Sequence, residues 1–98
     1  MTTTLRVDLQ VRDYDLWRQA FAQDRAGRAA HGMRRYRIFR PIDDDKRVLL
    51  DGDFDDAPSA RRFLEAMRTQ VWPDPGKAPA KIGMPVIVIA ELVETCEY

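Results

Sequence analysis

The hydrophobic pattern of the 98-residue chain predicts an α+β fold in which the elements follow one another as strand, helix, strand, strand, helix, strand. Segments 3–12 and 47–54 alternate apolar and polar residues, as half-buried strands do. Segments 14–30 and 57–71 instead repeat apolar residues every three or four positions, which is the helical period. This order is typical of the ferredoxin-like split βαβ arrangement, in which two helices cover one face of a four-stranded antiparallel sheet.

The first strand, 3–12, is followed directly by the first helix. Asp13 or Asp15 can cap this helix, because its carboxylate accepts hydrogen bonds from the free amides of the first turn. The alanine-rich stretch 26–30 is expected to extend the helix to Gly32, which suits the left-handed conformation of a helix end.

Segment 31–40 is expected to form the second strand and to stop at Pro41, which has no amide to donate to a sheet. Period two turns Tyr36 and Ile38 toward the core beneath the helices. The side chains on the opposite face are Arg35, Arg37 and Phe39. Residues 42–46 contain three consecutive aspartates and are interpreted as a solvated hairpin loop before the third strand.

The second helix is capped by Asp55 or Asp56 and carries Pro58 in its first turn. Prolines and glycines then interrupt any regular period over residues 72–85, a segment that is either a packed loop or a lid. The apolar run 86–93 is expected to form the last strand, and its continuity indicates a strand covered on both faces.

Length and charge narrow the classes of function. Ninety-eight residues predict a single domain over 1–98, and the modest burial available at this size favours a homodimer. Sixteen basic residues balance sixteen acidic ones, so the chain lacks the electrostatic footprint of a nucleic-acid-binding protein. We expect a cytoplasmic protein with no membrane span, because no export signal or long apolar segment is present and Cys96 is the sole cysteine.

The residue types present also restrict catalysis. The only histidine, His31, and the only serine, Ser59, would both be needed for a serine triad, which argues against a hydrolase. A histidine-rich or cysteine-based metal site is excluded, and the aspartate run 43–45 lacks the alternating spacing of a calcium loop. We therefore expect no metal and no cofactor.

The face of the sheet turned away from the helices mixes charged and apolar residues more than a solvated face does, so we expect it to pack against a second copy of the chain. The residues assigned to this dimer face are Arg35, Arg37, Phe39, Asp51, Ile87, Ile89 and Glu91. The arginines could bind an anionic ligand. Cross-strand pairing with the opposed carboxylates is the alternative, and we favour it.

A second candidate site lies between the helices and the sheet, beneath the Pro-rich segment. Its candidate substrate-binding walls are Trp17, Tyr36, Phe54, Phe63, Trp72 and Met84. Aromatic walls with few polar groups suit a flat, apolar small molecule, although ordinary core packing accounts for several of the same residues.

Two residues near this site are candidate catalytic groups. Tyr36 could donate a hydrogen bond to a carbonyl or phenolate. His31 could act as a general base, because imidazole titrates near neutral pH, or could simply sit exposed in the last turn of the first helix.

Several motifs resemble those of the small dimeric α+β barrel proteins, which include the antibiotic-biosynthesis monooxygenase-like and stress-responsive barrels. The motifs are Asp13-Tyr14-Asp15 followed by Trp17 and Phe21, the turn His31-Gly32-Met33 into a tyrosine-containing strand, and an Asp-rich hairpin before a strand ending at Asp53-Phe54. The resemblance covers nearly the whole chain outside the Pro-rich segment. It implies a homodimer whose two sheets pack face to face.

The chain also departs from that family. Haem-degrading members use an asparagine, a tryptophan and a histidine, and cofactor-free oxygenases often use asparagine and tryptophan. This chain has no asparagine, and Phe63 and Leu64 lie where the tryptophan is expected, so that machinery is not carried over. Leu9 also replaces a polar residue that many relatives place on the first strand.

Two functions stay open from the sequence. One is a cofactor-independent, monooxygenase-like enzyme acting on an aromatic or polyketide-like substrate. The other is a non-catalytic homodimer that binds a small ligand or stabilises a partner complex. The observation that separates them is whether a cavity survives between Trp72 and Tyr36 once the Pro-rich segment is folded.

Overall fold

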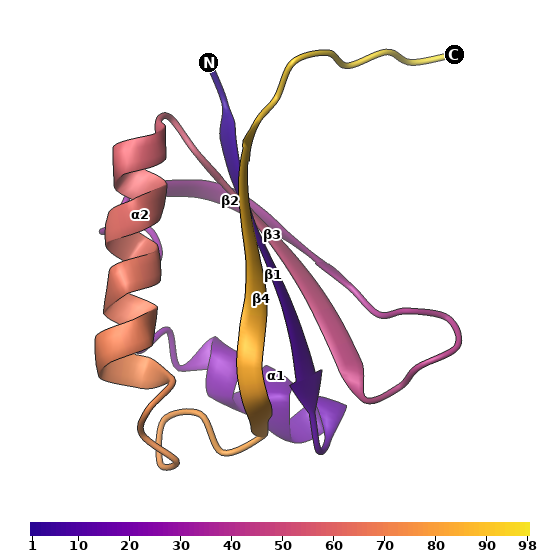
Figure 1. Cartoon of the computed structure of the whole chain (residues 1–98), viewed down its shortest axis with the longest axis vertical. Helices are drawn as coiled ribbons and strands as arrows, with labels where there is room; N and C mark the ends of the chain where they lie inside the picture. Colours follow the sequence, from indigo (N-terminus) through magenta and orange to yellow (C-terminus); the bar gives the residue numbers. More distant parts are fainter.

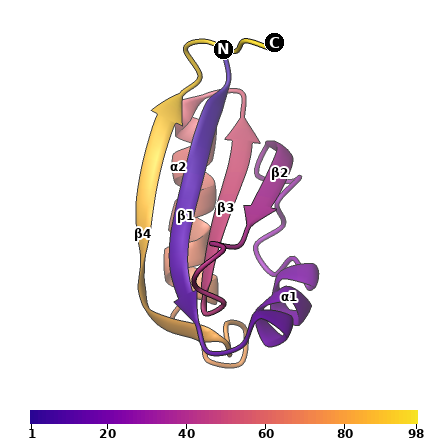
Figure 2. The same ribbon diagram turned by 90° about the vertical axis from the view of Figure 1, so that its right-hand side faces the viewer.

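Four antiparallel strands form one sheet in the order β2-β3-β1-β4 in the computed structural model, which describes residues 1–98. The strands are β1 (Thr3–Val11), β2 (Met33–Phe39), β3 (Arg47–Phe54) and β4 (Lys81–Glu91). The helices are α1 (Tyr14–Ala22) and α2 (Ala57–Ala66), and α2 continues into a π-helical turn, η1 (Met67–Val71). Both helices lie on one side of the sheet and the other side stays open (Figures 1 and 2). The predicted ferredoxin-like α+β fold is confirmed.

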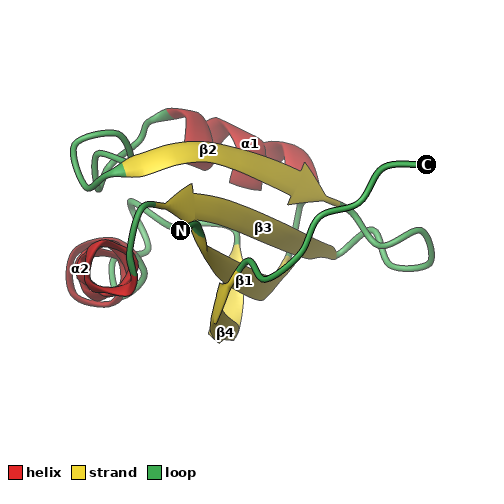
Figure 3. Ribbon diagram, turned by 90° about the horizontal axis from the view of Figure 1, so that it is seen from above, coloured by secondary structure: helices red, strands yellow, loops and turns green.

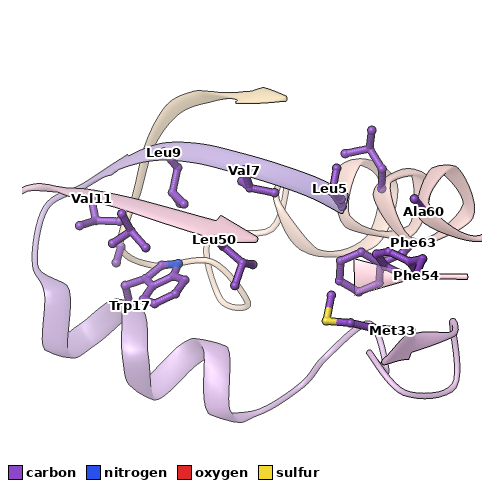
Figure 4. Packing of buried hydrophobic residues seen from close by; sticks show 13 residues of the cluster. Leu5, Val7, Leu9, Val11, Trp17, Met33, Leu50, Phe54, Ala60 and Phe63 are labelled. Carbon is purple, nitrogen blue, oxygen red and sulfur yellow. The ribbon is translucent and has the colours of Figure 1, made fainter. Parts of the chain in front are cut away.

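The core lies between the helices and the sheet. β1 pairs with β3 on one side and β4 on the other, so its apolar residues Leu5, Val7 and Leu9 are at most 4% exposed. Figure 4 shows Trp17 of α1 at one end of this core and Phe54 with Phe63 at the other. No helix is long and apolar enough to span a membrane.

The first helix ends earlier than predicted. Asp13 caps it, because its carboxylate accepts a hydrogen bond from the Leu16 amide at 2.9 Å. The last helical residue is Ala22, and Asp24 then adopts a left-handed φ of 51°. The Asp24 carboxylate accepts a hydrogen bond from the Arg28 amide at 2.8 Å, so local turns replace the expected helix over 26–30.

Two expectations near Gly32 have different outcomes. Gly32 has a φ of 93°, which confirms its left-handed conformation, but it ends a series of turns rather than a helix. The sequence predicts that His31 lies in the last turn of the first helix. In the structure it lies in these turns instead, so that prediction was wrong.

The start of the second helix is as expected. Asp56 caps α2 by accepting a hydrogen bond from the Ser59 amide at 2.8 Å, and Pro58 lies in the first turn.

Strand β2 lies at the edge of the sheet, which changes the surroundings of Tyr36. Its pairing with β3 shifts register between Met33 and Arg35, so that Arg34 projects outward and binds Asp55. Tyr36 remains 43% exposed, because an edge strand has no neighbour to cover its outer side. Tyr36 lies on the helix side of the sheet, as predicted, where it meets Phe21 of α1, but it is too exposed to belong to the core.

Strand β4 begins at Lys81 rather than at residue 86. Gln10 pairs with Ile82 and Asp8 pairs with Val86, so residues 83–85 bulge opposite a single residue of β1. Gly83 supports the bulge with a φ of 67°. Pro85 is tolerated there because β4 is an edge strand.

The register after this bulge corrects the predicted dimer face. Ile87 pairs with Val7 and Ile89 with Leu5, and paired residues share a face, so both isoleucines lie on the helix side of the sheet. Glu91 is likewise paired with the buried Thr3. The β4 side chains that lie on the open face are Val86, Val88 and Ala90. Val88 is 52% exposed, so within the chain β4 is not covered on both faces.

Candidate functional site

An apolar cavity of about 70 Å³ lies between the helices and the sheet, beneath the Pro-rich segment. Fourteen of its 19 lining residues are hydrophobic, and they come from both helices, from the central strands and from the chain that follows η1. The hydrophobic lining residues are Leu5, Val7, Leu9, Trp17, Ala20, Phe21, Ala26, Leu50, Phe63, Met67, Val71, Trp72, Ala78 and Ala80.

Three of the six predicted wall residues line this cavity, namely Trp17, Phe63 and Trp72. Phe54 is only 1% exposed and packs against Phe63, with 5.7 Å between ring centroids, so it is part of the core behind the wall. Met84 is 76% exposed at the β4 bulge and Tyr36 lies outside the lining.

The other walls are residues that the sequence presents as ordinary core. Phe21 stacks on Trp17 with 5.0 Å between ring centroids, and its sequence signals are its place in the helical stripe and in the motif that begins at Asp13. The π-helical turn η1 supplies Met67 and Val71 and is closed by a hydrogen bond of 2.8 Å from the Trp72 amide to the Met67 carbonyl. Such turns are frequent at functional sites. The four alanines of the lining leave space that larger side chains would fill.

The five charged lining residues are all at least partly exposed, and the part of the lining that they form is the mouth of the cavity. Its charged residues are Asp24, Arg25, Arg28, Lys77 and Lys81. The Arg28 guanidinium lies 3.9 Å from the centroid of the Phe21 ring and donates a 2.7 Å hydrogen bond to the Phe21 carbonyl. Its Nε also lies 3.6 Å from the Asp24 carboxylate. Arg28 is therefore fixed as part of the wall.

The two candidate catalytic residues lie just outside the cavity. His31 places Nδ1 3.0 Å from the Gly27 carbonyl oxygen, and its ring meets the Phe63 ring edge-on at 5.9 Å. Tyr36 meets Phe21 edge-on, with 5.0 Å between centroids. Each therefore touches a lining residue without facing the enclosed space.

The open face holds the predicted arginines and carboxylates in cross-strand pairs. Asp51 is 2% exposed and accepts hydrogen bonds from Arg6 Nε at 2.7 Å and Nη2 at 2.8 Å. Arg37 approaches Asp51 from the other neighbouring strand, at 3.6 Å. The bond from Arg6 is the main cause of the lowered pKa of the Asp51 carboxyl, and its desolvation opposes the shift.

Two more pairs follow the same pattern. Asp8 binds Arg47, with 2.7 Å between Oδ1 and Nε, and this hydrogen bond is the main cause of the lowered pKa of Asp8. Asp53 accepts hydrogen bonds from Arg35 at 3.0 Å and from the Thr4 hydroxyl at 2.7 Å. These carboxylates already serve as the counter-ions of the arginines, so the open face is a lattice of ion pairs rather than an empty anion site. Nowhere do three His, Cys, Asp or Glu side chains gather as metal ligands would.

The fold is shared with several solved structures. The cofactor-independent oxygenase SnoaB from Streptomyces nogalater is 18% identical with a TM-score of 0.63, covering 96% of this chain and 95% of that one. A candidate antibiotic biosynthesis monooxygenase from Bordetella bronchiseptica is 16% identical with a TM-score of 0.73, covering 95% and 98%. A dimeric ferredoxin-like protein from an uncultured marine organism is 10% identical with a TM-score of 0.70, covering 97% and 98%.

The sequence itself matches no protein-family model and no curated protein. The likeness is therefore one of architecture, extending over almost the full length of each chain. The chain has the fold of the antibiotic-biosynthesis monooxygenase-like and dimeric ferredoxin-like proteins, and the resemblance noted in its sequence is confirmed at that level.

Proposed function

We propose that the chain is a monooxygenase-like enzyme that binds an aromatic or polyketide-like substrate in the apolar cavity and oxidises it without a cofactor. The observation that carries this proposal is the cavity that remains beside Trp72 after the Pro-rich segment has folded over it. SnoaB, which has the same fold, is described as a cofactor-independent oxygenase.

The size of the cavity implies that its roof moves. About 70 Å³ is roughly half of the ~150 Å³ that a buried site uses to hold benzene. In the roof, residues 73–79, the amides of Asp74, Lys77 and Ala78 donate only to carbonyls between Val71 and Asp74. The carbonyl of Ala78 accepts one further bond, from the Lys81 amide at 3.4 Å, so the roof can tilt outward as a unit about this end while the local bonds stay intact.

The cavity walls suggest how the chain would contribute to the reaction. Apolar walls orient a flat substrate and exclude water, and the substrate itself supplies the electrons. A methylene flanked by phenolic rings could react with O₂ so that one oxygen becomes the carbonyl of the product and the other leaves as water. In this proposal Tyr36 and His31 act as positioning residues that hold the Phe21 and Phe63 rings.

We also propose that two copies of the chain pair through their open faces. Phe39, Val86 and Val88 are between 43% and 63% exposed there, on strands at opposite edges of the sheet. Cover from a second sheet would bury these apolar groups and leave the ion pairs between them intact. One protein of the same fold is described as dimeric.

The test of the enzymatic proposal is oxygen uptake by the purified protein with an anthrone and a naphthoquinol as probes. We expect uptake above the protein-free rate and formation of one product carbonyl per O₂ consumed from the anthrone. Ala20→Leu, which fills the cavity, should lower the rate at least ~10-fold, whereas Ala22→Leu on the exposed side of the same helix should leave it unchanged.

Equal rates for these two variants would contradict the location of the site. Binding of the probes without any oxygen uptake would favour the non-catalytic ligand-binding alternative.

A further inference from the structure

We propose that the ligand of this cavity is an anion, with its aromatic body among the apolar walls and its negative group at the mouth between Arg25, Lys77 and Lys81. This inference rests on the proposed function, because it needs the cavity to be the ligand site. It adds a charge requirement that the apolar walls alone do not impose.

The first observation is a local excess of positive charge. The chain as a whole has sixteen basic and sixteen acidic residues, yet the mouth has four basic residues and one acidic residue. That acidic residue, Asp24, is already engaged, since its carboxylate accepts the Arg28 amide at 2.8 Å and lies 3.6 Å from the Arg28 guanidinium. The mouth therefore has no spare carboxylate for its other three cations.

The second observation is that these three cations lack ionic partners. Arg25 and Lys77 have no carboxylate within 4.0 Å, and the Lys81 ammonium donates only to the Gly83 carbonyl at 2.8 Å. On the open face, in contrast, Arg6 and Arg47 each bind a carboxylate. Other basic residues of the chain are also unpaired, but these three lie together around the apolar cavity, where a ligand's charged group would lie.

The third observation is that the three cations come from two separate segments. Arg25 follows α1, whereas Lys77 lies in the chain between η1 and β4 and Lys81 is the first residue of β4; this part of the chain passes close to α1 at the bottom of the molecule (Figure 1). Lys77 and Lys81 are half-buried, so their apolar stems extend the wall while their ammonium groups stay at the surface. An anion held between both segments would draw the roof down onto the bound ring.

The test compares two fluorescent probes of nearly the same aromatic shape, the anionic 8-anilino-1-naphthalenesulfonate and the neutral N-phenyl-1-naphthylamine. We expect the anionic probe to bind about 10-fold more tightly and to weaken as salt is raised. The double variant Lys77→Ala, Lys81→Ala should weaken the binding of the anionic probe about 5-fold and change the affinity for the neutral probe less than twofold.

The matched control is Arg61→Ala, Arg68→Ala, which removes two positive charges from the groove between α2 and β4 and should leave both probes unaffected. A near-UV circular dichroism spectrum checks that each variant keeps its packing. If the neutral probe binds as tightly as the anionic one, or the lysine variant weakens both equally, the charge requirement is overturned and the cavity remains the site. If neither probe binds, the proposed cavity site fails as well.

Discussion

The two faces of the sheet are stabilised in different ways. On the helix face, Leu5, Val48 and Phe54 are at most 1% exposed and no charged side chain belongs to the core. On the open face, Asp51 is equally well covered, but by the arginines of its two neighbouring strands. Figure 3, viewed from above, shows how strongly this sheet twists from β2 to β4.

The two faces differ in whether a second chain would bury further apolar surface. The helix face is complete within one chain, because its apolar side chains are removed from water by α1 and α2. The open face satisfies its charges internally but leaves Phe39 and Val88 about half exposed. Substitutions on the first face should therefore act on folding, and those on the second on association and pH dependence.

The largest effect is expected from Phe54→Ala on the helix face. Phe54 is 1% exposed and packs on Phe63, so its removal leaves a cavity and should lower the free energy of unfolding by about 3–5 kcal/mol. Phe39→Ala on the open face should cost the monomer less than about 1 kcal/mol, because Phe39 is already 43% exposed. Urea denaturation at low protein concentration measures both. Similar losses for the two variants would show that the faces do not differ as described.

Much of the fold could be predicted from the sequence because strand 3–11 alternates strictly, strand 47–54 alternates over most of its length, and both helices begin at aspartate caps. The last strand was harder. The run 86–93 is apolar at almost every position, so its pattern does not indicate which side chains face the helices. Which face each side chain takes depends on the number of residues in the bulge at 83–85, and that number follows from the pairing of β4 with β1.

The cavity walls were predictable only in part, for the same reason. Trp17, Phe63 and Trp72 lie in or directly after helical stripes that must face the sheet. The position of Tyr36 depends on β2 being an edge strand, and that of Met84 on the bulge. The cations at the mouth become a group only when the segment after α1 meets the roof, which no local pattern records.

Neighbouring residues of β4 provide a direct test of the corrected register. Ile87→Lys should place a charge against the core beside Val7 and lower the free energy of unfolding by about 2–3 kcal/mol. Val88→Lys should leave the monomer within about 0.5 kcal/mol of the parent, because Val88 is 52% exposed. It should instead convert the proposed dimer to a monomer at micromolar concentration, as measured by light scattering. If Val88→Lys destabilises the monomer and Ile87→Lys only disrupts the dimer, then Ile87 lies on the open face and the corrected register is wrong.

The smallest expected effect concerns Asp51 and its dependence on pH. The folded-state pKa of this carboxyl is lowered, mainly by the hydrogen bond from Arg6, so its contribution to stability is fully present above the unfolded pKa near 4 and is lost as the pH falls through the folded value. Asp51→Asn should lower the free energy of unfolding at pH 7 by about 1–2 kcal/mol, less than for a fully buried pair, because Arg6 and Arg37 are more than half exposed.

The difference in the free energy of unfolding between Asp51→Asn and the parent should narrow as the pH is lowered from about 5 to 2, because Asp51 of the parent then becomes protonated and loses the same charge. Asp43→Asn, in the exposed hairpin loop, is the matched control and should follow the parent at every pH. Some acid sensitivity should persist in Asp51→Asn, because Asp8 is stabilised in its charged form by Arg47 in the same way. Urea denaturation across this pH range measures the effect. A constant gap would mean that Asp51 supports the open face through packing rather than through its charge.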